Sequence, residues 1–128
     1  YHLHQADYWY VPIGSCRVVL HDLRVGSPTD GATQVIDIGA RADGTHDHRG
    51  IFIPPGVAHG FASLTNMAIT YLVDSYYNPK DELGLAYNDK AVKADWGIAK
   101  PILSERDAAN PTRDAINDQV RPFWPMRT

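Results

Sequence analysis

Two histidines and an aspartate near the start of the chain have a spacing that could hold a metal ion. His2 and His4 are separated by one residue, and Asp7 follows three positions later. In an extended strand, residues two positions apart point to the same face, so both imidazoles would lie on one side of a sheet, with His59 opposite them. Neutral imidazoles with one carboxylate suit Zn, Fe, Ni or Mn. These residues therefore indicate a divalent-metal site as one alternative.

A further histidine lies in the segment RGIFIPPGVAHGF, which combines an apolar run with a corner. The run Ile-Phe-Ile over 51–53 favours a strand, and the Pro-Pro-Gly that follows must end it, since proline lacks a ladder donor and glycine permits a positive φ. His59 comes three residues after this corner. We expect it at the mouth of a barrel, where a rigid sheet can hold a functional side chain. The alternative is a polar residue satisfied beneath a turn.

The elements that must position these side chains are short strands. Apolar segments such as CRVVLHDL, TQVIDIG, IFI and MAITYLV recur up to Pro79, with turn residues between them and no helical period. This pattern predicts a mainly β fold, an antiparallel sandwich or barrel. Beyond Pro79, Ser104 can cap a short helix with Asp107 three residues on, and Pro111 opens another. Strands are therefore expected first and short helices last.

Length and composition set the limits for this fold. With 128 residues we expect a single domain over 1–128, with barrel strands in 1–79 and a helical and loop part in 80–128. A net charge of -3 provides no basic field for nucleic acid, and the sequence has no apolar stretch of membrane length. Cys16 is the single cysteine and lies in an apolar run, so we expect a buried thiol and a location in the reducing cytoplasm.

Several segments together resemble one family of sugar-nucleotide enzymes. VVLHDLRVGSPTDG, IFIPPGVAHGF, AITYLVDSYYNPKDELGLAYND and PILSERDAANP follow, in order and with similar gaps, the pattern of the dTDP-4-dehydrorhamnose 3,5-epimerase family. The resemblance implies a cupin-like jelly-roll barrel that is normally a homodimer. It also implies a pocket for a nucleoside-diphosphate deoxysugar with a 4-keto group, and no required metal or other cofactor.

The same resemblance implies catalytic roles. A C4 ketone acidifies the protons at C3 and C5, so epimerisation needs a base on one face of the sugar, an acid on the other and donors to the enolate oxygen. His4 matches the catalytic base of the family, and Asp107 matches the aspartate that accepts a hydrogen bond from this base. Tyr71 matches the acid on the opposite face, and His59 matches a histidine that polarises the ketone.

Substrate contacts are expected from three further residues. Arg24 and Arg49 stand beside the SPT turn and the Pro-Pro-Gly corner, where each can contact a sugar or a phosphate. Tyr77 can stack on a base. The alternative for the arginines is a solvated surface position, and the alternative for the tyrosine is packing on the sheet.

The sequence also departs from the family pattern, as an N-terminally short and divergent member would. The family carries a lysine about ten residues after the base, whereas here Asp7 occupies that region and the first lysine is Lys80. A carboxylate beside a developing oxyanion would oppose enolisation. Three functions therefore stay open: an epimerase of this family, a metal-dependent cupin using His2, His4, Asp7 and His59, and a non-catalytic jelly roll that binds a sugar or a partner.

Overall fold

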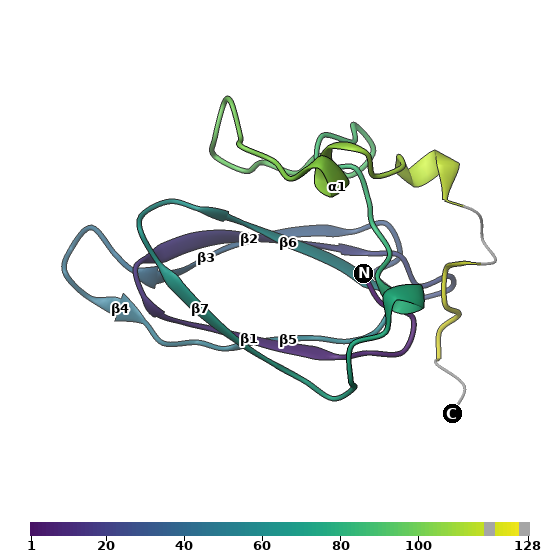
Figure 1. Ribbon diagram of the computed structural model, residues 1–128, viewed down its shortest axis with the longest axis horizontal. Coiled ribbons are helices and arrows are strands. Elements are labelled where there is room, and N and C mark those ends of the chain that lie inside the picture. The colour runs from purple at the N-terminus through teal and green to yellow at the C-terminus, as the bar shows by residue number, and fades with distance from the viewer. Residues whose placement is uncertain (117–119, 126–128) are drawn as a thin grey trace.

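The strands of the chain form two antiparallel sheets that pack face to face (Figure 1). The computed structural model describes residues 1–116 and 120–125. One sheet has the strand order β5-β1-β7, and the other has the order β4-β3-β2-β6. The strands are β1 (Asp7–Ile13), β2 (Ser15–Asp22), β3 (Thr33–Ala40), β4 (His46–Asp47), β5 (Ile51–Ile53), β6 (Val57–Ser63) and β7 (Ala68–Val73).

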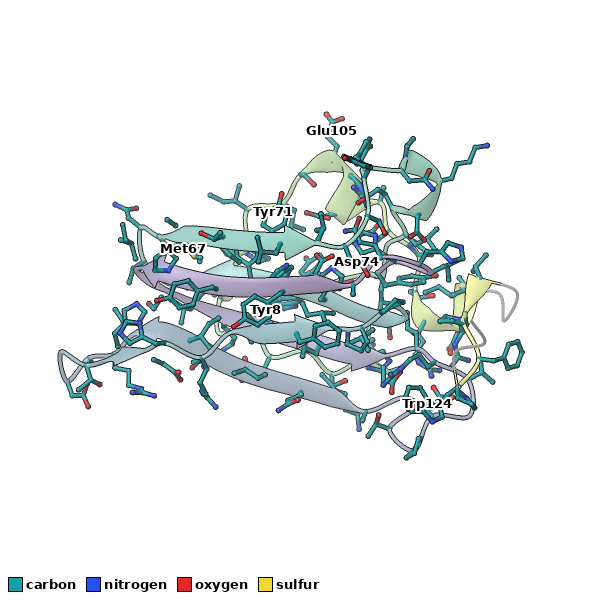
Figure 2. All side chains as sticks on the ribbon, turned by 90° about the horizontal axis from the view of Figure 1, so that it is seen from below. Tyr8, Met67, Tyr71, Asp74, Glu105 and Trp124 are labelled. Carbon is teal, nitrogen blue, oxygen red and sulfur yellow. The ribbon has the colours of Figure 1, made fainter. Side chains whose placement is uncertain are left out.

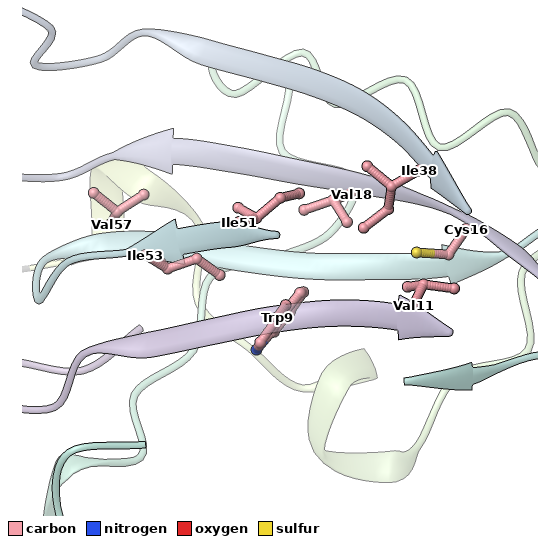
Figure 3. Packing of buried hydrophobic residues seen from close by; sticks show 8 residues of the cluster. All are labelled: Trp9, Val11, Cys16, Val18, Ile38, Ile51, Ile53 and Val57. Atoms are coloured by element: carbon pink, nitrogen blue, oxygen red, sulfur yellow. The ribbon is translucent and has the colours of Figure 1, made fainter. Parts of the chain in front are cut away.

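Side chains alternate between the core and the outside along these strands, as the pleat of a strand requires. Trp9 and Val11 of β1 face Cys16 and Val18 of β2, and all four are buried. Figure 3 shows this cluster, which also contains Ile38, Ile51, Ile53 and Val57. Burial raises the pKa of the Cys16 thiol to about 11, so this sulfur stays protonated at neutral pH. The expectation of a buried thiol is thus confirmed.

The corner after β5 has the features of a type II turn. The amide of Val57 donates to the carbonyl of Pro54 at 3.3 Å, Pro55 takes the second position, and Gly56 takes the third with φ +82°. A Cβ at Gly56 would meet the side chains of Arg24 and Pro122. The turn reverses the chain from β5 into β6, and β6 carries His59 in its middle.

The outer face of the β5-β1-β7 sheet is apolar and open to solvent. Tyr8 is paired with Phe52 on one side and with Leu72 on the other, so the three side chains share this face. Their exposed fractions are 43%, 64% and 66%, respectively. Figure 2 views the molecule from this side, with Tyr8 on the sheet.

Short helices follow the last strand: η1 (Pro79–Asp81), α1 (Glu105–Ala108) and η2 (Arg113–Ala115). The hydroxyl of Ser104 accepts from the amide of Asp107 at 3.1 Å, which confirms the predicted N-cap. The mainly β, jelly-roll type of fold with short C-terminal helices is likewise confirmed. Among the described residues, no helix is long and apolar enough to cross a membrane.

The last described residues return to the end of β2. The amide of Trp124 donates to the carbonyl of Val25 at 2.9 Å, and the Arg24 guanidinium lies 4.6 Å from the centre of the Trp124 ring. Figure 2 shows Trp124 at this end of the molecule. The tail therefore packs against the same loop that contains the SPT turn.

Candidate functional site

A cavity lies along β6, which is an edge strand of the larger sheet. Its volume of about 780 Å³ is in the range of small-molecule sites. The chain between η1 and η2, which includes α1, passes over this sheet and covers it (Figure 1). The lining consists of Tyr1, His2, Trp9, Val19, His21, residues 58–63 and 82–87, Val92, Ala94, Trp96, Ile98, residues 100–103, Arg106, Asp107 and Asn110.

The cover segment 82–110 packs closely on β6 at one glycine. A Cβ at Gly60 would come 3.0 Å from the ring of Trp96, so the absence of a side chain lets the indole lie against the strand. The indole Nε1 donates to the carbonyl of Tyr87 at 2.8 Å, which fixes the ring within the cover segment. One wall of the cavity is therefore a strand and the other is mostly irregular chain.

His59 is a largely buried imidazole in the strand wall, with its side chain 10% exposed. Its Nδ1 lies 2.9 Å from the carbonyl oxygen of Val57, which can only accept, so Nδ1 carries the proton and Nε2 has a free lone pair. Burial is the largest cause that lowers the pKa of His59, to about 4. The ring edge also contacts the indole of Trp9, with centroids 5.1 Å apart. At neutral pH, His59 is thus a neutral ring with an available Nε2.

His2 has a matching arrangement. Its Nδ1 lies 2.7 Å from the carbonyl oxygen of Asp81, so this imidazole also keeps its proton on Nδ1. The carboxylate of Asp81 accepts from the amides of Leu3 and His4 and so holds the first residues of the chain in place. The ring of His2 lies beside that of His59, with centroids 5.4 Å apart.

Asp7 lies buried between the two imidazoles. One carboxylate oxygen is 3.8 Å from Nε2 of His2, and the other is 3.6 Å from Nε2 of His59. These oxygens accept hydrogen bonds from the side-chain amide of Gln5 at 2.8 Å and from the indole of Trp9 at 3.3 Å. The region in which the family pattern has a lysine thus supplies a buried carboxylate.

The expectation that His2 and His4 point to one face of a strand is wrong. β1 begins only at Asp7, and the residues before it follow an irregular path held by Asp81. His2 is consequently buried in the site, whereas His4 is exposed and does not line the cavity. Of the four residues in the metal alternative, the structure brings together His2, Asp7 and His59.

The predicted catalytic residues take different positions around the cavity. Asp107 lines it from α1, but no hydrogen bond or ion pair joins its carboxylate to His4 within the described parts of the chain. Tyr71 is paired with Trp9 and so shares the inner face of its sheet, yet its side chain is 61% exposed and does not belong to the lining. Figure 2 shows Tyr71 on the edge strand β7.

The predicted substrate-binding residues other than His59 lie outside the cavity lining. The guanidinium of Arg24 forms an ion pair with Asp22 at 2.8 Å and stacks on Trp124. That of Arg49 forms an ion pair with Asp47 at 2.7 Å on the surface. Tyr77 is 77% exposed beyond the end of β7.

Two basic residues of the cavity wall were missed by the sequence reasoning. Lys100 and Arg106 line the cavity on the same side as Asp107, and Arg106 forms an ion pair with Glu82 at 3.4 Å. Arg106 lies within the segment LSERDAANP, next to Asp107 on the same short helix, so the helix-start signal could have indicated it. Lys100 lies in irregular chain without a comparable signal.

Comparison with known proteins gives a consistent result. The sequence pattern of the dTDP-4-dehydrorhamnose 3,5-epimerase family matches residues 1–114. The dTDP-4-dehydrorhamnose 3,5-epimerase of Mycobacterium tuberculosis is 35% identical over 125 residues, which cover 94% of this chain and 59% of that protein. The spore coat polysaccharide biosynthesis protein SpsL of Bacillus subtilis is 37% identical over 100 residues, which cover 75% of this chain and 63% of that protein.

Solved structures agree with the sequence comparison. The rmlC epimerase of Mycobacterium tuberculosis superposes with a TM-score of 0.83 at 34% identity, over 94% of this chain and 60% of that chain. The epimerase of Legionella pneumophila, solved in complex with dTDP-4-keto-L-rhamnose, has a TM-score of 0.81 at 30% identity, over 96% of this chain and 67% of that chain. The chain spans about three fifths of the length of the two curated relatives described above. On sequence and structure together, it belongs to the dTDP-4-dehydrorhamnose 3,5-epimerase family.

Proposed function

We propose that this protein epimerises a nucleoside-diphosphate 4-keto-6-deoxy sugar by removing a proton next to the ketone. One observation carries this proposal: in a chain of this family, a neutral and largely buried imidazole at His59 forms part of the wall of a cavity of about 780 Å³. A general base must be unprotonated at the working pH and must reach the substrate. His59 meets the first condition, and its place in the cavity wall supports the second.

The tautomer of His59 favours the role of a base over that of a donor. Because Nδ1–H is directed to Val57, Nε2 can accept a proton from C3 or C5 but cannot donate to the ketone while the ring is neutral. The roles that the resemblance implies for His4 as the base and for Tyr71 as the acid remain predictions. Asp107 and Tyr71 are the candidates for the groups that handle the second proton.

The substrate class follows from the family and from the charges of the cavity wall. The Legionella relative was solved with dTDP-4-keto-L-rhamnose, and we expect a related nucleotide sugar here. Lys100 and Arg106 provide cationic groups to which a diphosphate can bind. Proton transfer beside a ketone needs only side-chain acids and bases, so we propose a reaction without a cofactor.

Sugar binding without turnover is the second candidate function. The buried carboxylate of Asp7 lies 3.6 Å from Nε2 of His59, in the region where the family pattern has a lysine. A negative charge at this place disfavours an enolate, although it does not hinder the binding of a neutral sugar ring.

We also propose that the protein is a homodimer in the cytoplasm. The apolar outer face formed by Tyr8, Phe52 and Leu72 would be covered by the same face of a second copy. Cys16 is buried and unpaired, which suits a reducing compartment.

The test is hydrogen exchange at the sugar. Protein treated with EDTA is incubated with dTDP-4-keto-6-deoxyglucose in deuterated water, and deuterium at C3 and C5 is followed by NMR. We expect incorporation well above the buffer rate and a loss of at least about 100-fold in His59→Asn, the range that general bases contribute. Absence of incorporation with folded protein would refute the epimerase and leave sugar binding, which saturation-transfer NMR detects.

Three further variants separate the roles. His48→Asn is the matched control, because His48 is an exposed histidine near β4, outside the cavity lining. It should exchange as the parent does. His4→Ala and Tyr71→Phe test the roles implied by the resemblance: a loss in His4→Ala equal to that in His59→Asn would return the base to His4.

A further inference from the structure

A buried carboxylate lies beside the imidazole that we propose as the base. One oxygen of Asp7 is 3.6 Å from Nε2 of His59, the nitrogen that would take the proton. Both side chains are largely buried, so water screens the pair little. His59 lines the cavity, whereas Asp7 does not belong to the lining. The carboxylate is therefore placed to act on the imidazole and not to contact a bound sugar.

Hydrogen bonds hold Asp7 in this place without neutralising its charge. The side-chain amide of Gln5 donates to one oxygen at 2.8 Å, and the indole of Trp9 donates to the other at 3.3 Å. Both donors are neutral, and no lysine or arginine forms an ion pair with Asp7 in residues 1–116 and 120–125. Since a buried charge is costly unless it is paired, this carboxylate favours the formation of a cation next to it.

The other imidazole beside Asp7 already has partners for both ring nitrogens. Nδ1 of His2 donates to the carbonyl oxygen of Asp81 at 2.7 Å, and Nε2 lies 3.3 Å from the amide nitrogen of Gln5, which can only donate. Nε2 of His59 has no hydrogen-bond partner in the described part of the chain, because 3.6 Å to Asp7 is beyond hydrogen-bond length. A proton that enters this cluster is therefore expected on His59.

The charge of Asp7 has two opposite effects on the removal of a proton from the sugar. It stabilises an imidazolium on His59, and it destabilises the negative charge of an enolate. The imidazolium would form 3.6 Å from the carboxylate, whereas the sugar would occupy a cavity that Asp7 does not line. Because the Coulomb energy falls with distance, the effect on His59 is the larger one.

We propose that Asp7 is a positioning residue that stabilises His59 in its protonated form while the sugar is an enolate. This inference rests on the proposed function. Nε2 of His59 takes the proton next to the ketone, the electron pair of the broken C–H bond goes into the enolate, and the new N–H group forms an ion pair with Asp7. The family resemblance names Asp107 as the partner of the base, so Asp7 is a second carboxylate, in the region where the family pattern has a lysine.

The direction of the effect on the exchange rate tests this role. Deuterium exchange into dTDP-4-keto-6-deoxyglucose is measured at several sugar concentrations for the parent, Asp7→Asn and Asp7→Ser, after folding has been checked by circular dichroism. Serine has no amide that could occupy Nε2 of His59. We expect kcat to fall about 10-fold or more in both variants, because an opposite charge this close changes a protonation equilibrium by about that factor. KM should stay near that of the parent, because Asp7 does not line the cavity. An unchanged or higher kcat in both variants would overturn the proposal.

Two further variants show whether the effect is specific. Asp47→Asn is the matched control, because Asp47 is also a buried carboxylate but lies on β4, outside the cavity lining. It should keep the kcat of the parent, and a loss equal to that in Asp7→Asn would refute a specific role for Asp7. In the His59→Asn background, Asp7→Asn should cause no further loss, since Asp7 acts through His59.

A measurement without sugar separates this inference from the proposed function. Burial is the largest cause that lowers the pKa of His59 to about 4, and the charge of Asp7 acts in the opposite direction. At the pH at which nitrogen NMR shows the His59 ring of the folded parent to be half protonated, the ring in Asp7→Asn should be mostly neutral. Exchange in the parent combined with equal protonation in the two proteins would refute the role of Asp7 alone. Absence of exchange in the parent would refute the epimerase, and this role with it.

Discussion

His21 takes part in a hydrogen-bond chain that requires a neutral ring. The hydroxyl of Thr33 donates to the carbonyl of Val92, so its oxygen accepts from Nδ1 of His21 at 2.8 Å. Nε2 then accepts from Arg113 at 3.0 Å. Burial, followed by the charge of Arg113, lowers the pKa of His21 below its ordinary value. Through this chain, β2 and β3 are joined to the cover segment and to η2.

This arrangement predicts that acid weakens the fold. Between the ordinary histidine pKa near 6.5 and the lower pKa of the folded state, the unfolded chain binds a proton that the folded chain does not, so stability falls as the pH falls through this window. We expect His21 to contribute a loss of at most about 1.4 kcal/mol per pH unit. Urea unfolding at pH 7, 6 and 5 should show a smaller loss in His21→Gln than in the parent.

His48→Gln is the control for this comparison. His48 is exposed, so its replacement should leave the acid-induced loss unchanged. An identical loss in the parent and in His21→Gln would mean that other groups account for the pH dependence.

Sequence reasoning identified part of the site at this scale. Asp107 and His59 were predicted, and both line the cavity, because the helix cap and the corner are local features that fix where the next side chain goes. His4 was expected in the site from an alternating pattern and, as the base, from the family resemblance, yet the backbone there follows the distant carboxylate of Asp81. The place of His2 beside His59 depends on a second long-range contact, between Nδ1 of His2 and the carbonyl oxygen of Asp81, which the sequence pattern does not contain.

At the scale of elements, the turn between β5 and β6 determines where His59 lies. Gly56 has φ +82°, and a Cβ there would also contact Arg24 and Pro122. The Gly56→Ala variant therefore combines backbone strain of about 1–2 kcal/mol with a steric conflict. We expect a lower midpoint of urea unfolding, and slower deuterium exchange at the sugar because β6 shifts.

Gly44 offers a matched control for that variant. Its φ is +84°, but a Cβ there would meet nothing within 4 Å. The Gly44→Ala variant should have only the backbone strain, so the difference between the two variants measures the packing of the corner. Equal unfolding midpoints would show that the contacts with Arg24 and Pro122 contribute nothing.

The strands and caps were the most predictable elements. The Ile-Phe-Ile run forms β5, in which the two isoleucines are buried and the phenylalanine is exposed. Ser104 caps α1, as the spacing between Ser104 and Asp107 predicted. The cover segment was not predictable in this way. Residues such as Trp96 and Lys100 lie in irregular chain, whose path depends on contacts with β6 and not on a local period.

At the scale of the whole molecule, the exposed apolar face of the β5-β1-β7 sheet predicts self-association. The Phe52→Lys and Leu72→Lys variants each place a charge on this face, next to Tyr8. We expect a dimer for the parent and a monomer for both variants in light scattering coupled to size exclusion at micromolar concentration.

Val35→Lys is the control for the dimer. Val35 lies on β3 in the other sheet and is 41% exposed, so the same change in charge there should leave the dimer intact. A monomeric parent, or dimers that persist in both face variants, would rule out this interface.

The two walls of the cavity differ in kind, since one is a hydrogen-bonded strand and the other is irregular chain that contacts it at Trp96. His59, which we propose as the base, lies on the strand wall, whereas Asp107, Lys100 and Arg106 belong to the cover. We therefore expect substitutions of Lys100 or Arg106 to alter the proposed binding of a sugar nucleotide, while the sheet keeps His59 in place. Under the proposed function, such a division would let the choice of nucleotide change without displacing the base.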